Sequence, residues 1–291
     1  MFQDVTKLSG ALVAGLLCAG VAQANHPVVV EGNCLKPFTD ATPLANVPIP
    51  GNVGAACGDF DGDGLIGEAE DNDGDLVFGT IAAALAEISQ NGLITVVTSG
   101  TFPEVVTITG NVTLEAAPGV SANIEAFVRG EVAPETGPLQ GAPGIVVNAP
   151  ANRQVVLRNL TSRNWTDGVR ITGDSRVMVD NVRVEHNINN GIVVSDNARV
   201  AIVDSRVSST GHRVNPGTGD FPSMDFAPAP GDGISFLDNS EGIINSTVVT
   251  GSFRFGMNNG TGNADALFVR ESSAFDNGDD FSPGFNFNRF R

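Results

Sequence analysis

Lysine is almost absent from this sequence. Of its 16 basic residues only Lys7 and Lys36 are lysines, so a mechanism that needs a lysine base or a Schiff base is excluded from the main body of the chain. Charged residues make up only 17% of the chain, against roughly 25% in ordinary soluble domains. The 33 acidic residues produce a net charge of −17, which repels nucleic acid and favours cations as partners.

The sequence also lacks a transmembrane segment. The apolar run at residues 11–21 is shorter than the about 20 residues that a bilayer requires. Lys7 precedes this run and Ala22-Gln23-Ala24 follows it, a pattern typical of a signal peptide. We therefore expect cleavage after Ala24 and a secreted protein (extracellular, cell-surface or periplasmic). The alternative is lipidation at Cys18, although the preceding leucines are bulkier than a lipidation site normally tolerates.

Cysteine is scarce as well. Beyond the signal peptide only Cys34 and Cys57 are present. An even pair in an exported chain predicts one disulfide, which would close a Pro- and Gly-rich loop and contribute about 3 kcal/mol to stability. The alternative is two unpaired thiols.

The most specific motif is acidic. Residues 59–70 fit the pattern D-x-D-x-D-G-x5-E without a mismatch and resemble the calcium loops of EF-hand and dockerin-type repeats. Alternating carboxylates converge on a hard cation, Gly64 permits the sharp turn, and the last glutamate closes the site bidentately. The expected Ca²⁺ ligands are Asp59, Asp61, Asp63, the Leu65 carbonyl and Glu70. Asp71, Asp73 and Asp75 are candidates for a second ion, and the alternative for the motif is a solvated acidic loop.

One helix is predicted, over residues 78–90. Thr80 is its expected N-cap, Ile81, Leu85 and Ile88 share one face, and Asn91-Gly92 ends it. Short β-rich runs follow, separated by Gly, Asn or Pro. The first of these are Leu93–Thr98, Val105–Thr109 and Val112–Ala116.

The strands then become a repeat. Five equivalent segments begin at Gly144, Gly168, Gly191, Gly233 and Gly256, and all but one of the intervals between them are close to a single period. A second strand recurs between these glycines and begins at Val155, Val177, Val200 and Ala266. A period of about 23 residues with two or three short strands is typical of a β-solenoid, whose stacked coils share one core. A β-sandwich is the alternative, but sandwiches do not normally repeat at this period.

The segments Phe78–Leu85, Ile94–Phe102 and Val112–Ala116 resemble the opening of pectin-lyase-like right-handed parallel β-helices. The resemblance covers roughly Val77 to Phe275 and implies an all-β solenoid whose first coil is capped by a short α-helix. It implies little about activity, because that superfamily contains lyases, glycosidases, epimerases, tailspikes and non-catalytic surface proteins.

We therefore divide the chain into four parts. Residues 1–24 are the expected signal peptide, and 25–76 form a disulfide-closed segment with the calcium loop at 59–70. Residues 77–280 form the parallel β-helix with its cap helix at 78–90, and 281–291 form a C-terminal tail. Two Pro- and Gly-rich segments, Arg129–Pro143 and Val214–Gly231, interrupt the coil rhythm and are expected to be loops.

No complete catalytic motif is present. Polygalacturonase-like members use Asn-Thr-Asp, then Asp-Asp, then Gly-His-Gly. Here Asn189-Asn190 stands where Asp-Asp would fall, and Gly211-His212-Arg213 follows, so the paired carboxylate is lost. Pectate-lyase-like members place calcium and an arginine or lysine base on a coil, whereas the calcium loop here precedes the solenoid. Neither activity is carried over.

Stacking by one period nevertheless predicts a cluster at one corner. Asp167 and Asp232 lie one residue before two of the repeat glycines, so they are expected two coils apart, roughly 10 Å. Arg163 and His186 are one repeat period apart and are expected to be adjacent, and Trp165 is a candidate for stacking on a sugar. The alternative is that Asp-Gly and Asn-Gly are simply favourable turn sequences.

Two functions follow from these features. The first is a non-catalytic, calcium-stabilised extracellular protein that binds polysaccharide or a cell-surface component, or packs into a surface layer. The alternative is a polysaccharide lyase or hydrolase that uses the predicted corner. The tail contains Phe281, Phe285, Phe287 and Phe290. It is expected to cover the last coil of its own chain, and the alternatives are self-association through the open solenoid end and disorder.

Overall fold

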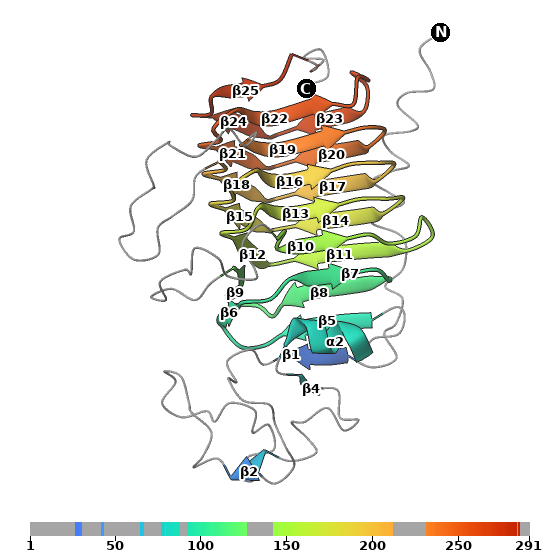
Figure 1. Cartoon of the computed structure of the whole chain (residues 1–291), viewed down its shortest axis with the longest axis vertical. Helices are drawn as coiled ribbons and strands as arrows, with labels where there is room; N and C mark the ends of the chain where they lie inside the picture. The colour runs from blue at the N-terminus through green and yellow to red at the C-terminus, as the bar shows by residue number, and fades with distance from the viewer. Residues whose placement is uncertain are drawn as a thin grey trace.

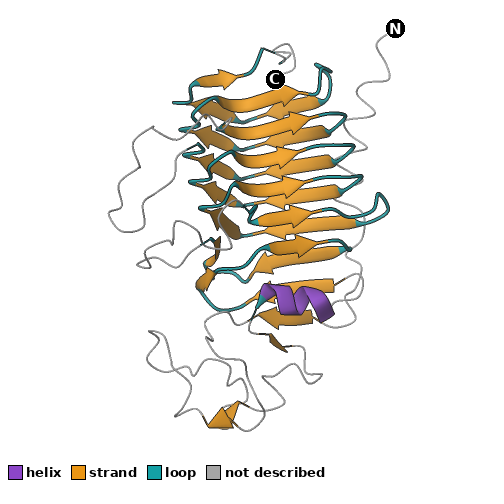
Figure 2. Ribbon diagram, viewed as in Figure 1, coloured by secondary structure: helices purple, strands orange, loops and turns teal. Residues whose placement is uncertain are grey.

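Figure 1 shows a computed structural model of the chain. It describes residues 80–87, 92–126, 142–211, 231–283 and 285, together with the backbone of strands at 27–30, 42–43, 65–66 and 77–78. The strands and turns wind into a solenoid whose coils stack along the long axis of the molecule (Figures 1 and 2). Three parallel sheets run along the stack. The predicted all-β parallel β-helix is therefore confirmed, with three strands in a complete coil.

Each sheet collects strands from successive coils. Sheet 1 contains β4 (Val77–Phe78), β1 (Pro27–Val30), β5 (Gly92–Val96), β8 (Val112–Ala116), β11 (Gln154–Arg158), β14 (Arg176–Asp180), β17 (Arg199–Val203), β20 (Glu241–Asn245) and β23 (Leu267–Arg270). Sheet 2 contains β7 (Val106–Ile108), β10 (Ile145–Val147), β13 (Asp167–Ile171), β16 (Asn190–Val194), β19 (Asp232–Leu237), β22 (Phe255–Gly260) and β25 (Asp279–Phe281). Sheet 3 contains β6 (Gly100–Phe102), β9 (Ala122–Glu125), β12 (Leu160–Arg163), β15 (Arg183–Glu185), β18 (Arg206–Ser208), β21 (Val248–Thr250) and β24 (Ser273–Phe275). Strands β2 (Thr42–Pro43) and β3 (Leu65–Ile66) form a separate antiparallel pair.

The register of sheet 2 follows the five repeat glycines that were identified in the sequence. The residues immediately after the five glycines pair from coil to coil, in the order Ile145, Val169, Ile192, Ile234 and Met257. Asn190 therefore lies opposite Asp232 although nearly two repeat periods separate them in the sequence. The extra residues fall between β18 and β19, which is where the sequence predicted an insertion.

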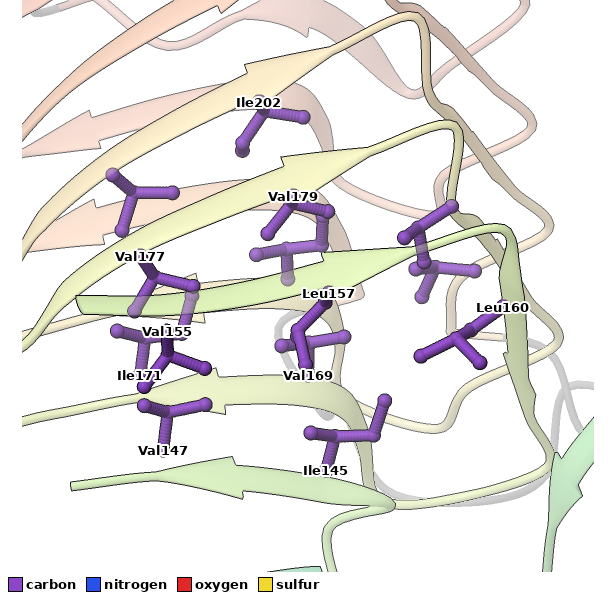
Figure 3. Close-up of a cluster of buried hydrophobic side chains, with 14 of the residues drawn as sticks. Ile145, Val147, Val155, Leu157, Leu160, Val169, Ile171, Val177, Val179 and Ile202 are labelled. Atoms are coloured by element: carbon purple, nitrogen blue, oxygen red, sulfur yellow. The ribbon is translucent and has the colours of Figure 1, made fainter. Parts of the chain in front are cut away.

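The core is a continuous column of apolar side chains inside the coils. On alternate positions of each strand, residues such as Val155, Leu157, Val169 and Ile171 point inward and stack on their neighbours (Figure 3). Burying each such side chain contributes about 1.5–3 kcal/mol, and no coil could bury them alone. The solenoid is therefore stable only as a stack.

Single residues in the left-handed region turn the chain at the corners. Between sheets 1 and 3 these residues are Asn159, Asn181, Asp204, Ser246 and Glu271, and between sheets 3 and 2 they are Asn164, His186, Ser209, Gly251 and Asp276. Asn and Asp tolerate a positive φ better than most residues do. The side-chain amide of Asn181 also donates to the side-chain oxygen of Asn159 at 2.8 Å, so polar side chains stack from coil to coil at this corner.

Helix α2 (Ile81–Glu87) begins later than predicted, and residues 88–91, where its end was predicted, lie outside the described residues. It does not begin at Phe78, because Val77–Phe78 is strand β4. The predicted N-cap is confirmed, since the Thr80 Oγ1 accepts a hydrogen bond from the Ala83 amide at 3.1 Å. The helix contacts β1, β4, β5 and β7 at the N-terminal end of the stack (Figure 1), where Ile81 and Ala84 join the core.

Sheet 1 differs from the expected pattern at two places. Strand β1 pairs in parallel with β5 and β4, so residues 27–30 extend a sheet that was expected to begin near residue 77. The repeat position assigned to Ala266 belongs to Leu267, which pairs with Gly242. The whole strand β20 was missed because Gly242 replaces the expected valine. A Cβ there would lie 2.2 Å from the Phe236 ring, so that ring fills the space.

Several predicted features lie outside the described residues. They are the signal peptide, Cys34 and Cys57, the side chains of the calcium loop 59–70, Asp71, Asp73 and Asp75, both insertions apart from Ala142, Pro143 and Gly231, and most of the tail. Among the described residues, no helix has the length and apolar character that crossing a membrane would require.

Candidate functional site

The two aspartates of the predicted corner, Asp167 and Asp232, are the first residues of strands β13 and β19 in sheet 2. Asp167 of β13 pairs with Asn190 of β16, which in turn pairs with Asp232 of β19. The two aspartates are therefore two coils apart in one column, as the repeat arithmetic predicts. Both are buried, with exposed fractions of 2% and 1%. A buried carboxylate needs partners, and these partners decide what the corner can do.

Both oxygens of Asp167 are occupied. Its Oδ2 accepts hydrogen bonds from the Nε of Arg170, at 3.0 Å, and from the Nη2 of the same guanidinium. Its Oδ1 accepts from the backbone amide of Asn190 at 3.2 Å and from the side-chain amide of that residue at 2.8 Å. Four donors fill the roughly four lone-pair positions of a carboxylate.

Asp232 is held in the same way two coils further along the stack. The Nε of Arg254 donates to its Oδ1 at 2.7 Å, and the Nη2 donates to its Oδ2. The Phe255 amide, the Ser235 hydroxyl and the Asn258 side chain complete the shell at 3.3, 2.7 and 2.9 Å. The hydrogen bonds to Asp232 raise the pKa of Arg254; burial opposes this rise, and the charge of Asp232 adds to it. The guanidinium is therefore more firmly protonated than usual.

A partner of Asp167, Asn190, lies beside a partner of Asp232, Ser235. The Ser235 hydroxyl lies 3.5 Å from the Asn190 Oδ1 and also donates to Asp232. Arg170 and Arg254, with side chains 41% and 45% exposed, cover the two buried carboxylates. The surface at this corner therefore consists of two half-exposed guanidinium groups above fully paired carboxylates. Within the described ranges no three His, Cys, Asp or Glu side chains converge as a metal site.

Contrary to the repeat arithmetic, Arg163 does not lie directly opposite His186. Arg163 lies opposite Glu185, while His186 follows at the corner, in the left-handed region. The offset between β12 and β15 is one residue shorter than the offset between β13 and β16, because the extra residue of this coil is inserted between β15 and β16. Arg163 instead binds the buried Glu125 through its Nε at 2.8 Å and its Nη2 at 2.7 Å.

Trp165 cannot stack on a sugar, which corrects the second expectation for this corner. Its side chain is 1% exposed, and its Nε1 donates to the Ile124 carbonyl at 2.9 Å. The indole packs over Gly144, where a Cβ would lie 2.4 Å from the Trp165 Cδ1. This tryptophan is part of the core.

The sequence reasoning missed the arginines that pair with both aspartates. Arg170 follows Asp167 by three residues, and Arg254 directly precedes Phe255, the next residue in the column of Asp232. The column arithmetic therefore contained a signal for Arg254. Nothing in the spacing identifies Glu125, since it precedes the first insertion and its coil lacks the glycine landmark.

Both insertions rejoin the solenoid at this corner. The Ala142 carbonyl accepts from the Thr166 amide, one residue before Asp167. Gly231, the residue before Asp232, accepts a hydrogen bond through its carbonyl from the Arg254 amide. Loops on a rigid scaffold commonly carry binding function, and the described ends of both insertions lie beside the two aspartates.

A comparison with protein families now places the fold. The model for the right-handed β-helix region matches residues 106–273, which is more than half of the chain. The chain belongs to the right-handed β-helix family. A comparison of this β-helix protein with curated protein sequences gives no match.

Two solved structures resemble the β-helix protein. The crystal structure of pectate lyase Pel9A superposes with a TM-score of 0.50 at 13% identity and covers 90% of this chain. This chain spans 57% of the length of that structure, and the likeness shows the fold alone. An alginate lyase from Paenibacillus sp. strain FPU-7 has a TM-score of 0.43 at 14% identity, covering 69% of this chain and 71% of the other, which is too distant to carry an argument.

Proposed function

We propose that this β-helix protein is a secreted, calcium-stabilised, non-catalytic protein that binds polysaccharide at the cell surface or in an extracellular layer. The observation that carries the proposal is the saturation of Asp167 and Asp232. Each carboxylate accepts at least four hydrogen bonds, two of them from an arginine. A general acid or base needs an oxygen free to reach the reacting proton.

The alternative is a polysaccharide lyase or hydrolase, and the fold shared with pectate lyase Pel9A is the observation in its favour. A lyase at this corner would need Arg170 or Arg254 as its base. A guanidinium hardly deprotonates in proteins, and Asp232 raises the pKa of Arg254 further. The carboxylate of Asp232 that holds Arg254 in place therefore also makes it a poorer proton acceptor. This arrangement supports binding of a polysaccharide better than its cleavage.

The test separates binding from cleavage. The purified protein is incubated with uronate-containing and neutral polysaccharides, and retention on the insoluble polymer, ultraviolet absorbance of unsaturated products and reducing ends are measured. We expect retention without products, and retention unchanged in Asp167→Asn. Products that disappear in Asp167→Asn or Asp232→Asn would overturn the proposal and favour the enzyme.

The calcium part of the proposal rests on the loop at residues 59–70. We expect its five ligands to bind one Ca²⁺ in the roughly 10⁻⁴–10⁻³ M range of extracellular modules. Because the ion binds only the native state, the melting temperature should rise with calcium concentration. Asp61→Ala should abolish this rise, whereas the exposed Asp174→Ala should not. Identical melting curves with EDTA and with calcium would contradict the proposal.

A further inference from the structure

The outer face of sheet 3 carries a straight column of side chains, all of them polar except Val248. Pairing from β9 to β24 aligns, in order, Asn123, Thr161, Arg183, Arg206, Val248 and Ser273. Their neighbours Val184, Val207 and Val249 are fully buried, and side chains alternate along a strand. The column therefore faces outward, about 4.8 Å from one member to the next.

Arg183 and Arg206 are the unusual members of this column. They lie directly opposite each other on adjacent coils, and both are exposed. Like charges in that arrangement are destabilising. Within the part of the chain that the structure describes, no carboxylate lies within 4 Å of either guanidinium.

Five other arginines of the solenoid are neutralised by a carboxylate. Arg158, Arg163, Arg170, Arg199 and Arg254 each contact an aspartate or glutamate. The chain as a whole carries twice as many acidic as basic residues, 33 against 16. Acidic partners are therefore plentiful, and the pair at Arg183 and Arg206 nevertheless lacks one among the described side chains.

An aromatic ring lies on the same face. Phe275 ends β24, its side chain is 45% exposed, and it is one of three large apolar side chains exposed among the described residues. Phe275 lies two residues after Ser273, on the same strand. Ser273 belongs to the column and lies two coils beyond Arg206, about 10 Å along the stack. The strands that form this face run up the left side of Figure 1, from β12 to β24.

We propose that the outer face of sheet 3 is a binding site for an anionic glycan. One oxyanion of the glycan, a carboxylate or a sulfate, bridges the guanidinium groups of Arg183 and Arg206, which are well suited to planar, bidentate recognition of such groups. A sugar ring of the same chain packs on Phe275 through its C–H face. The proposal rests on the proposed polysaccharide-binding function and places it away from the corner, where the arginines are already paired.

The experiment measures affinity for three soluble probes: polygalacturonate, dextran sulfate and uncharged dextran. Arg183→Gln/Arg206→Gln should weaken binding of the anionic probe at least about tenfold, because hydrogen bonds to charged groups are lost. Phe275→Ala should weaken it about fivefold. The matched control is Arg176→Gln/Arg199→Gln, which removes the same charge from an in-register pair on sheet 1. Whether polygalacturonate or dextran sulfate binds identifies the oxyanion.

The outcomes separate this inference from the proposed function. A loss confined to the Arg183/Arg206 variant supports the site. An equal loss in the control would overturn it, because binding would then follow total charge alone. Unchanged binding in the Arg183/Arg206 variant, or binding of dextran only, would overturn the site and leave the proposed function standing. If the native protein retains no polysaccharide, soluble or insoluble, both proposals fail.

Discussion

At the scale of single residues, the corner of sheet 2 is held by arginines that reach from the surface to buried carboxylates. Arg254 is 45% exposed and Asp232 is 1% exposed, so the two partners do not depend on each other equally. If Asp232 is removed, the guanidinium of Arg254 can be hydrated by water. If Arg254 is removed, the carboxylate of Asp232 stays buried without its charged partner. Removing the arginine is therefore the more costly change.

We predict that Arg254→Ala lowers the free energy of unfolding by about 2 kcal/mol, less than the about 3–5 kcal/mol of a fully buried pair, because other donors still hold Asp232. The free energy of unfolding of Arg254→Lys should lie between those of Arg254→Ala and the native protein, since lysine keeps the charge but cannot form the bidentate contact of a guanidinium. Arg176→Ala, at an exposed arginine without an ion pair among the described residues, should stay within about 0.5 kcal/mol. Urea unfolding measures all three. Equal effects for Arg254→Ala and Arg176→Ala would contradict the interpretation.

The contact between Gly144 and Trp165 yields a second prediction at this scale. A Cβ on Gly144 would lie 2.4 Å from the Trp165 Cδ1, so Gly144→Ala should destabilise the protein by about 1–3 kcal/mol through overpacking. Gly110→Ala is the control, because nothing lies within 4 Å of its Cβ position. Trp165 is the only tryptophan, and its fluorescence should therefore shift in Gly144→Ala and not in Gly110→Ala. An unshifted spectrum in both would show that the packing is looser than described.

At the scale of elements, helix α2 is fixed by a residue of the following coil. Both carboxylate oxygens of Glu104 accept hydrogen bonds from the first helical amides, Ile81 at 2.9 Å and Ala82 at 2.8 Å. These amides have no partner within the helix. Burial raises the pKa of Glu104 above its ordinary value of 4.5, and the two amides oppose that rise.

This raised pKa predicts a pH dependence of stability. The folded protein holds the Glu104 proton more tightly than the unfolded chain does, so the contribution of this group is fully present below about pH 4.5 and is lost as the pH rises through the folded pKa. The melting temperature of the native protein, minus that of Glu104→Gln, should therefore increase as the pH is lowered from 8 toward 4.5. A difference that stays constant or shrinks on acidification would contradict the assignment.

Much of the element pattern could be predicted from the sequence, because the glycines at 144, 168 and 191 mark one position of each coil and register then follows by counting. The register predicted in this way is wrong where a coil has an extra residue, and a strand is missed where another residue type replaces the one that marks the repeat. The extra residue between β15 and β16 separates Arg163 from His186, and Gly242 hid strand β20. The ion pair of Arg170 depends on where a long side chain folds back, which strand spacing does not determine.

At the scale of the whole molecule, an open solenoid must close its two ends. Helix α2 covers the core at the N-terminal end through Ile81 and Ala84. At the other end, sheets 1, 3 and 2 finish at β23, β24 and β25, with no described strand on their outer edges. Phe281 and Phe285 pack there against the core, with ring centroids 5.2 Å apart in an edge-to-face arrangement.

This packing favours a tail that covers its own last coil over a tail that docks on a neighbouring molecule. Truncation after Asp280 removes both rings. It should lower the free energy of unfolding by about 2 kcal/mol, since each side chain is only partly buried. The same truncation should promote aggregation by exposing apolar core and strand edges. Thermal melting and light scattering measure these two effects.

The full-length variant Phe285→Ala distinguishes the ring from the rest of the tail and should reproduce part of the loss in stability. Phe275→Ala, at an exposed ring on the last coil, is the control and should leave the melting temperature nearly unchanged. A truncated protein that is more soluble and melts at the native temperature would show that the tail serves assembly, because the end of the solenoid would then be closed only by a second molecule.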